Sequence, residues 1–375
     1  MVTLIPFMLT MIGLSYVSVN GLRDWAERQR VLAIPNERSS HVRPTPSGGG
    51  AAIVGFSLLS LIVATLWSAY QEALPLSLTV WSYVGGAGAI AVISWFDDRY
   101  MLPNRWRIMV HSLSALVILC GIGSWQSVTL PLLGQVNLGW LGLPLSFVWL
   151  VGMTNVYNFM DGIDGLAGSQ AVIAGVGWAL FGWWIGQPFV LALGLGIAAS
   201  SVGFLGHNWS PARIFMGDVG SAFLGFSFAV LPIVAAHHEP RLALAGLLLL
   251  WPFLFDAGFT LLRRLRHGEN IFTAHRSHLY QRLVITGHSH RTVTLLYIGL
   301  ALVGFLLALV WFVEVKGVAI ALLSVLPLLA LGLWLLVINQ EQQPTSPAIT
   351  ALITTHQTNA DPEVAISAPI GSLQR

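Results

Sequence analysis

Long apolar runs alternate with short polar segments along most of this chain. Eleven runs approach or exceed the roughly 20 residues that a helix needs to cross the hydrocarbon layer of a bilayer. They cover residues 2–19, 48–69, 76–95, 108–125, 138–156, 168–185, 187–206, 219–236, 242–262, 292–313 and 317–338. The pattern predicts an all-α fold: a polytopic integral membrane bundle of about 10–11 transmembrane helices, in one domain over residues 1–338.

The segments between and after these runs refine this prediction. No basic residue precedes the run at 2–19, so we expect a retained first helix and not a cleaved signal peptide. Gly186 to Pro188 separates two runs and indicates a tight helical hairpin. Residues 339–375 are polar and rich in Gln, Thr, Pro and Ser, which predicts a disordered tail.

Composition supports the membrane assignment. Hydrophobic residues make up 55% of the 375 residues and charged residues only 9%, with a mean hydropathy of +0.74. These values exclude a soluble globular domain, and they give no indication of a nucleic-acid partner. Cys120 is the single cysteine and cannot form an internal disulfide.

Basic residues are distributed unevenly over the loops. Of the 18 Lys and Arg residues, fifteen fall in the odd-numbered loops and only Arg241 and Lys316 in the even-numbered ones. Positively charged loops face the cytoplasm. We therefore expect the odd-numbered loops and the tail to be cytoplasmic, the N-terminus to be periplasmic, and the protein to lie in the bacterial inner membrane.

The unusual polar motifs fall in the odd-numbered loops as well. In NVYNFMDGIDGL, Asn155, Asn158 and Asp161 follow a spacing of three that lines one face of a helix, and Asp164 follows them. A glycine turn with capping acids is the plain alternative. Oxygen side chains beside flexible glycines favour a hard cation together with a phosphate group.

Three further acids suggest the same chemistry. The adjacent Asp97 and Asp98 could bind a metal or accept a proton, or could simply be a solvated helix end. Asp218 lies between Gly217 and Gly220 at the start of an apolar run, where it could hold a cation while the helix start binds an anion. A plain capping aspartate is the alternative.

The last odd-numbered loop contains AHRSHLYQRL. We interpret His275, Arg276 and His278 as phosphate contacts, although a basic segment resting on anionic lipid would have the same composition. His288 and His290 are assigned to that lipid-contact role alone. Asp256, inside an apolar run, is either a hydrogen-bonding residue of the bundle interior or part of a substrate path. The PTPSGGG segment at 44–50 indicates close packing or a loop that faces phosphate.

Together these motifs resemble the polyprenyl-phosphate N-acetylhexosamine-1-phosphate transferases, over about residues 44–282. The segments NVYNFMDGIDGLAG and PARIFMGDVGS carry most of the resemblance, and FDDR agrees with it. AHRSHLYQRL and PNERSSHVRPTPSGGG are most similar to the branch that initiates lipopolysaccharide O-antigen. The resemblance implies that a phosphate oxygen of undecaprenyl phosphate attacks the β-phosphorus of a UDP-N-acetylhexosamine and releases UMP, directly or through an enzyme-bound intermediate.

The resemblance also implies roles for residues and a cofactor. Mg²⁺, or alternatively Mn²⁺, would bridge the diphosphate, and a homodimer is one candidate oligomeric state. The implied metal ligands are Asn158 and Asp218; the implied catalytic acids are Asp97, Asp98 and Asp161; and the implied substrate contacts are Asp164, Arg105, His275, Arg276 and His278. The donor sugar stays open among N-acetylfucosamine, N-acetylquinovosamine and N-acetylglucosamine.

Two departures from the family pattern stand out. Many members have a lysine shortly after the paired aspartates, and here Arg99 or Arg105 would have to replace it. The triple-histidine loop of the peptidoglycan enzyme is missing from the sequence, which argues against a MurNAc-pentapeptide donor.

Two other classes of protein are alternative interpretations of these motifs. A CDP-alcohol phosphatidyltransferase requires further aspartates at fixed spacing down one helix, but the next acid after Asp164 is Asp218. An ion-coupled transporter carries its acids near mid-membrane, whereas these acids lie at the ends of the predicted spans.

Overall fold

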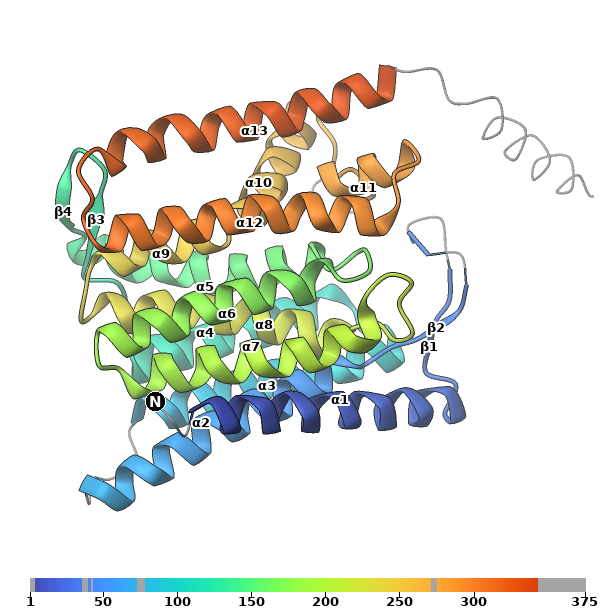
Figure 1. The fold of residues 1–375 in the computed structure, drawn as a ribbon, viewed down its shortest axis with the longest axis horizontal. Coiled ribbons are helices and arrows are strands. Elements are labelled where there is room, and N and C mark those ends of the chain that lie inside the picture. Colours follow the sequence, from blue (N-terminus) through green and yellow to red (C-terminus); the bar gives the residue numbers. More distant parts are fainter. Residues whose placement is uncertain (1–3, 36–39, 42, 73–77, 271–274, 343–375) are drawn as a thin grey trace, which may run out of the picture.

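The structure is a computed structural model that describes residues 4–35, 40–41, 43–72, 78–270 and 275–342. It is built almost entirely from helices (Figure 1). The helices are α1 (Leu4–Arg28), α2 (Gly50–Glu72), α3 (Leu78–Tyr100), α4 (Asn104–Gly121), α5 (Gly142–Phe159), α6 (Leu166–Trp184), α7 (Pro188–Asn208), α8 (Asp218–Ala236), α9 (Arg241–Leu249), α10 (Trp251–Arg266), α11 (Leu279–Ile285), α12 (His290–Phe312) and α13 (Val318–Gln342).

The predicted all-α membrane fold is confirmed. The described residues contain nine helices long and apolar enough to cross a membrane, or ten if the bent pair α9 and α10 forms one span. The predicted span at 108–125 corresponds to α4, which is not among these nine. The predicted tight turn is also present, since α6 ends at Trp184, Gly186 has a φ of +64° and α7 begins at Pro188.

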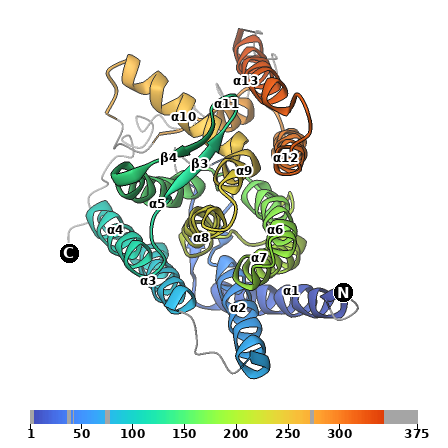
Figure 2. The ribbon, with the colours of Figure 1, turned by 90° about the vertical axis from the view of Figure 1, so that its left-hand side faces the viewer.

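The prediction of one continuous span at 242–262 is wrong. The chain bends by 75° between α9 and α10. Pro252 follows directly after the break and cannot donate a backbone hydrogen bond to the preceding turn. As a result α10 leaves the bundle and runs outward to the periphery (Figure 2).

Two small antiparallel hairpins mark the opposite ends of the bundle (Figure 1). β1 (Leu32–Ala33) pairs with β2 (Thr45–Pro46) at the end where α11 also lies. β3 (Ser127–Leu130) pairs with β4 (Gly134–Asn137) at the other end. The motif-bearing loops meet at the first of these ends.

The core is organised around α8, which lies near the centre of the end-on view (Figure 2). The whole apolar window of α8 is buried. Glycine allows neighbouring helices to approach it closely, as is usual for membrane bundles. A Cβ atom on Gly225 would lie 2.7 Å from the backbone oxygen of Met153 in α5.

Glycine also allows the start of α8 to approach the start of α2 closely. A Cβ atom on Gly50 would lie 2.4 Å from the Cα atom of Gly220. The amides of Gly49 and Gly50 donate to the backbone oxygens of Phe215 and Met216, at 3.0 and 2.9 Å. The glycine triplet of PTPSGGG therefore serves close packing, which fixes the loop that leads into α8.

Candidate active site

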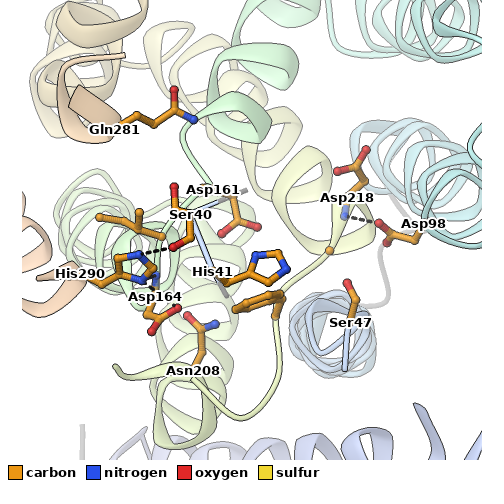
Figure 3. Close-up of a pocket in the computed structure, with 14 residues that line it drawn as sticks. Ser40, His41, Ser47, Asp98, Asp161, Asp164, Asn208, Asp218, Gln281 and His290 are labelled. Carbon is orange, nitrogen blue, oxygen red and sulfur yellow. Dashed lines mark hydrogen bonds and ion pairs between the residues drawn. The ribbon is translucent and has the colours of Figure 1, made fainter. Parts of the chain in front are cut away.

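A cavity of about 260 Å³ lies at the end of the bundle where the polar motifs meet (Figure 3). Four acids from three separate segments line it. Aromatic and amide side chains complete a wall suited to a planar ring and to polar groups. The lining residues are Ser40, His41, Ser47, Asp98, Asp161, Gly162, Ile163, Asp164, Asn208, Phe215, Gly217, Asp218, Gln281 and His290.

Asp98 caps the central helix α8. Its two carboxylate oxygens accept hydrogen bonds from the backbone amides of Asp218 and Val219, at 2.8 and 3.1 Å. The anion-binding helix start predicted next to Asp218 is therefore already occupied by a carboxylate of the protein itself. Gly217 makes this possible, because it has a φ of +74° and its missing Cβ atom would lie 2.7 Å from Asp98 Oδ2.

Arg107 holds together the polar groups on the other side of Asp218. Its guanidinium lies 3.0 Å from a carboxylate oxygen of Asp97 and 3.0 Å from one of Asp218. It also donates to Asn158 Oδ1 at 2.7 Å. Asn158 in turn donates to Asp218 Oδ1 at 2.9 Å and to Ser221 Oγ at 2.8 Å.

A third arginine, besides the Arg99 and Arg105 that were expected to stand in for the missing lysine, contacts the acids. Arg107 lies on the first turn of α4, and its guanidinium reaches the acids. Arg105 is exposed and does not line the cavity. The two positions lie on different sides of the helix, because a separation of two residues turns the side chain by about 200°.

Asp161 lies beyond the helix that was expected to carry it. α5 ends at Phe159, so the stripe of three side chains stops at Asn158 and Asp161 enters a turn instead. Tyr280 of α11 supports that turn: its hydroxyl donates to the backbone oxygen of Phe159 at 2.9 Å. A Cβ atom on Gly162 would lie 2.1 Å from the same hydroxyl oxygen.

The surroundings of Asp161 oppose its ionisation. Burial in the cavity, together with the neighbouring carboxylates of Asp218, Asp98 and Asp164, raises its pKa to about 8. Four acids that face one space make a strongly electronegative site. Such a site favours a bound cation.

Asp164 links three segments of the chain. One of its carboxylate oxygens lies 3.2 Å from His290 Nδ1, and the other accepts from the amide of Ala212 at 3.1 Å. Burial alone would raise the pKa of Asp164, but the bonds to His290 and Ala212 outweigh it and hold the pKa below its usual value. Asn208 completes the link by accepting from the amide of Gly165 at 2.9 Å.

The AHRSHLYQRL loop is placed differently from its predicted role. His278 precedes the first residue of α11 and is buried, with Nδ1 3.2 Å from Asp256 Oδ1. His275 lies outside the helix, and burial lowers its pKa to about 4, so the imidazole is neutral at physiological pH. Neither of these histidines nor Arg276 lines the cavity, to which this loop contributes Gln281.

Asp256 explains why the loop takes this position. This fully buried carboxylate accepts from the amides of Leu279 and Tyr280, at 2.8 and 3.1 Å, and from the hydroxyl of Tyr297. It therefore acts as the interior hydrogen-bonding residue that was one of its two predicted roles. It orients α11, and through α11 both Tyr280 and Gln281.

Of the ten predicted site residues, the cavity brings together Asp98, Asp161, Asp164 and Asp218. Asn158 bonds Asp218 directly, and Asp97 contacts Asp218 through Arg107. His41 and His290 also line the cavity and were not predicted as site residues. His290 had been assigned to lipid contact, yet this residue pairs with Asp164, and its Nε2 donates to the backbone oxygen of Ser40 at 3.1 Å. Asn155, which received no ligand role, bonds Val151 within its own helix and approaches His111.

The chain is a multi-span helical bundle with a cluster of acids at one end, an arrangement compatible with a membrane enzyme that handles phosphate groups. Comparison with known proteins agrees. The family model described as glycosyl transferase family 4 matches residues 80–236. The chain is 32% identical over 280 residues to a probable undecaprenyl-phosphate N-acetylglucosaminyl 1-phosphate transferase of Bacillus subtilis, with 73% of this chain and 75% of the relative covered.

Two more relatives extend the comparison. A decaprenyl-phosphate N-acetylglucosaminephosphotransferase of Mycobacterium leprae is 30% identical, with 79% of this chain and 81% of the relative covered. A phospho-N-acetylmuramoyl-pentapeptide-transferase of Synechococcus is 30% identical, with 65% and 72% covered. The chain belongs to glycosyl transferase family 4 and is a phosphotransferase. Membership favours this activity over the phosphatidyltransferase and transporter alternatives.

Proposed function

We propose that this protein transfers the sugar 1-phosphate of a UDP-N-acetylhexosamine to undecaprenyl phosphate, in the inner membrane of a bacterium. The acceptor's phosphate oxygen attacks the β-phosphorus, the bond between the two donor phosphates breaks, and UMP leaves with the electron pair. The observation that carries the proposal is the cavity in which Asp98, Asp161, Asp164 and Asp218 meet at the end of the membrane helices.

The same cavity has features suited to a nucleotide. The rings of His41 and Phe215 lie 4.8 Å apart and form an aromatic wall. Asn208 and His290 also line the cavity, and their polar atoms hold the surrounding loops through bonds to Gly165, Ile214, Asp164 and Ser40. A planar base with polar edges fits a wall of this composition.

The donor set suits Mg²⁺, with Mn²⁺ as the alternative. Carboxylate and amide oxygens are the ligands that Mg²⁺ prefers, and it is usually held by one or two carboxylates together with substrate phosphates. In the described part of the chain no three His, Cys, Asp or Glu side chains gather into a metal site, so the ion would need further ligands from the donor's diphosphate. When bound, the ion offsets the charge that develops on the phosphates.

Asn158 and Asp218 would hold this ion. Their side chains are bonded directly to each other, with Asn158 Nδ2 as the donor, and the amide oxygen of Asn158 accepts from Arg107. Arg107 contacts Asp218 and supplies positive charge beside it. Asp97 and Asp98 remain the candidates to take a proton from the acceptor phosphate, and Asp161 faces the diphosphate.

The identity of the sugar is a finer proposal. The relatives from Bacillus and Mycobacterium carry N-acetylglucosamine in their names. The AHRSHLYQRL segment is similar to the branch that initiates O-antigen, where N-acetylfucosamine and N-acetylquinovosamine donors also occur. We propose that the protein catalyses the first membrane step of such a surface polysaccharide.

Release of UMP in membranes that contain the protein and undecaprenyl phosphate tests the reaction. We expect Mg²⁺-dependent release with one of UDP-GlcNAc, UDP-GalNAc, UDP-FucNAc or UDP-QuiNAc. Asp218→Asn should lower turnover about 100-fold or more, because removal of one group that stabilises developing charge has effects of this size.

Asp24→Asn is the matched control. It removes a carboxylate of α1 that is paired with Arg23, outside the cavity, and should leave turnover unchanged. Near-normal turnover by a folded Asp218→Asn protein would disprove the metal-ligand assignment. Lack of UMP from all four donors would contradict the proposed reaction.

A further inference from the structure

The last helix of the described chain, α13, contains a single charged residue. This is Glu341, one residue before the helix ends. Only 17% of the apolar window of α13 is buried within the protein, and most of its other side chains are apolar. A carboxylate on the last turn of a helix faces the negative end of the helix dipole, which disfavours it. A positively charged partner would offset this repulsion.

Arg282 of α11 is that partner. Its Nε and Nη2 atoms donate to Oε1 and Oε2 of Glu341, at 2.7 and 2.6 Å. Two parallel hydrogen bonds between a guanidinium and a carboxylate fix the direction of approach as well as the distance. The Arg282 side chain is only 11% exposed, so the pair is partly shielded from water. The contact joins α11 to the end of α13, which lies next to it (Figure 1).

α11 contributes to the candidate active site through the two residues before Arg282. Tyr280 supports the turn that carries Asp161, and Gln281 lines the cavity. A helix of seven residues is too short to be stable by itself, so its position depends on contacts with its neighbours. Asp256 of α10 accepts the first two amides of α11. Arg282 provides a separate attachment, to α13.

We propose that Arg282 and Glu341 are positioning residues for the donor: their ion pair attaches α11 to α13 and so holds Tyr280 and Gln281 at the cavity. Neither Arg282 nor Glu341 lines the cavity itself. This inference rests on the proposed function, because the donor is the UDP-sugar of that reaction. Without the pair, α11 spends part of its time displaced, and the apparent affinity for the donor falls with the fraction that remains in place. The donor complex, once formed, has its normal geometry, so the effect is on KM and not on kcat.

Initial rates of UMP release over a range of donor concentrations test the proposal in the wild type, Arg282→Gln, Glu341→Gln and the double variant. We expect each single variant to raise the KM for the donor about three- to fivefold, toward the upper end for one partly exposed ion pair, with kcat within about twofold of the wild type. The double variant should match the single variants, since all three lack the same contact. Raising NaCl from about 50 mM to about 500 mM should reduce the difference between the wild type and the variants.

Glu314→Gln is the matched control. It removes a carboxylate that pairs with Arg241 at the opposite end of the bundle, outside the cavity, and should leave the KM unchanged. Additive effects on KM in the double variant would overturn the proposal. A fall in kcat with unchanged KM would overturn it as well.

Hydrogen exchange over residues 279–285 separates this proposal from the reaction on which it rests, because the measurement needs no donor. We expect faster exchange in Arg282→Gln and Glu341→Gln than in the wild type or Glu314→Gln. Equal exchange in all four proteins would mean that the pair does not hold α11 and would overturn the proposal. Lack of UMP from the wild type, together with faster exchange in the two variants, would contradict the proposed reaction while supporting the attachment of α11 to α13.

Discussion

Asp161 illustrates how far the behaviour of one residue depends on its neighbours. As an isolated side chain it would be ionised at neutral pH. In the cavity, burial and three neighbouring carboxylates raise its pKa to about 8. A bound cation would stabilise the ionised form of these carboxylates and so favour loss of the proton from Asp161. For this reason the site suits a divalent metal.

This shift predicts a pH dependence of stability in the absence of metal. The folded-state pKa of Asp161 exceeds its unfolded value of about 3.9, so the folded protein binds the extra proton between those two values. The free energy of unfolding should therefore fall as the pH rises toward about 8 and then level off. The amide in the Asp161→Asn variant cannot ionise, so the variant should not lose this stability. Its Tm should exceed that of the wild type by several degrees at pH 8.

Thermal unfolding in EDTA between pH 5.5 and pH 8.5 measures this difference. Mg²⁺ added at pH 8 should raise the Tm of the wild type more than that of Asp161→Asn. Parallel pH profiles for the two proteins would show that Asp161 does not carry the shifted pKa.

At the scale of the element, α11 depends on a buried acid of another helix. Asp256 of α10 accepts both backbone amides at the start of α11, and Tyr280 then supports the turn that carries Asp161. The bend that separates α10 from α9 brings Asp256 to this position. The broken span is therefore part of what builds the cavity.

Replacement of Asp256 tests this dependence. Asp256→Asn leaves at least one backbone amide of α11 facing an NH₂ group and without an acceptor. This should lower the free energy of unfolding by about 1–3 kcal/mol. We expect faster hydrogen exchange over residues 279–285 and about tenfold lower UMP release from a folded protein. Tyr297→Phe removes a single bond to Asp256 and should have a smaller effect in the same direction. Unchanged exchange in Asp256→Asn would mean that α11 is held by other contacts.

At the scale of the whole molecule, the loops sort into two groups. Contacts such as Asp98 with Asp218, Asp164 with His290 and Tyr280 with Phe159 join the motif-bearing loops at one end. The opposite end contains β3, β4 and the contact of His237 with Ser124. This separation agrees with the two groups into which the arginines divide the loops.

Cysteine labelling tests which end faces the cytoplasm. In a Cys120→Ser background, Gln135→Cys places a thiol on β4 and Arg266→Cys places one at the end of α10; both positions are exposed. We expect a membrane-impermeant maleimide to label Gln135→Cys in right-side-out vesicles and Arg266→Cys in inverted vesicles. If Gln135→Cys were labelled in inverted vesicles and Arg266→Cys in right-side-out vesicles, the proposed orientation would be wrong.

Hydropathy and charge along the chain determined the class of fold, most of the spans and the grouping of the polar loops. These properties are local: each span needs only its own apolar residues, and each loop carries its own charges. The acids Asp98, Asp161, Asp164 and Asp218 were identified for the same reason, since an acid at the end of an apolar run is conspicuous in any arrangement of the helices.

Only the tertiary structure decided which partners these acids have. It selected Arg107 over Arg105, brought His290 to Asp164 across the bundle, and placed Asp98 on the start of α8. It also broke the span before α10. Such contacts join residues far apart in sequence, and they depend on helix rotation and on close glycine crossings such as Gly50 with Gly220. No periodicity within a single segment encodes that geometry.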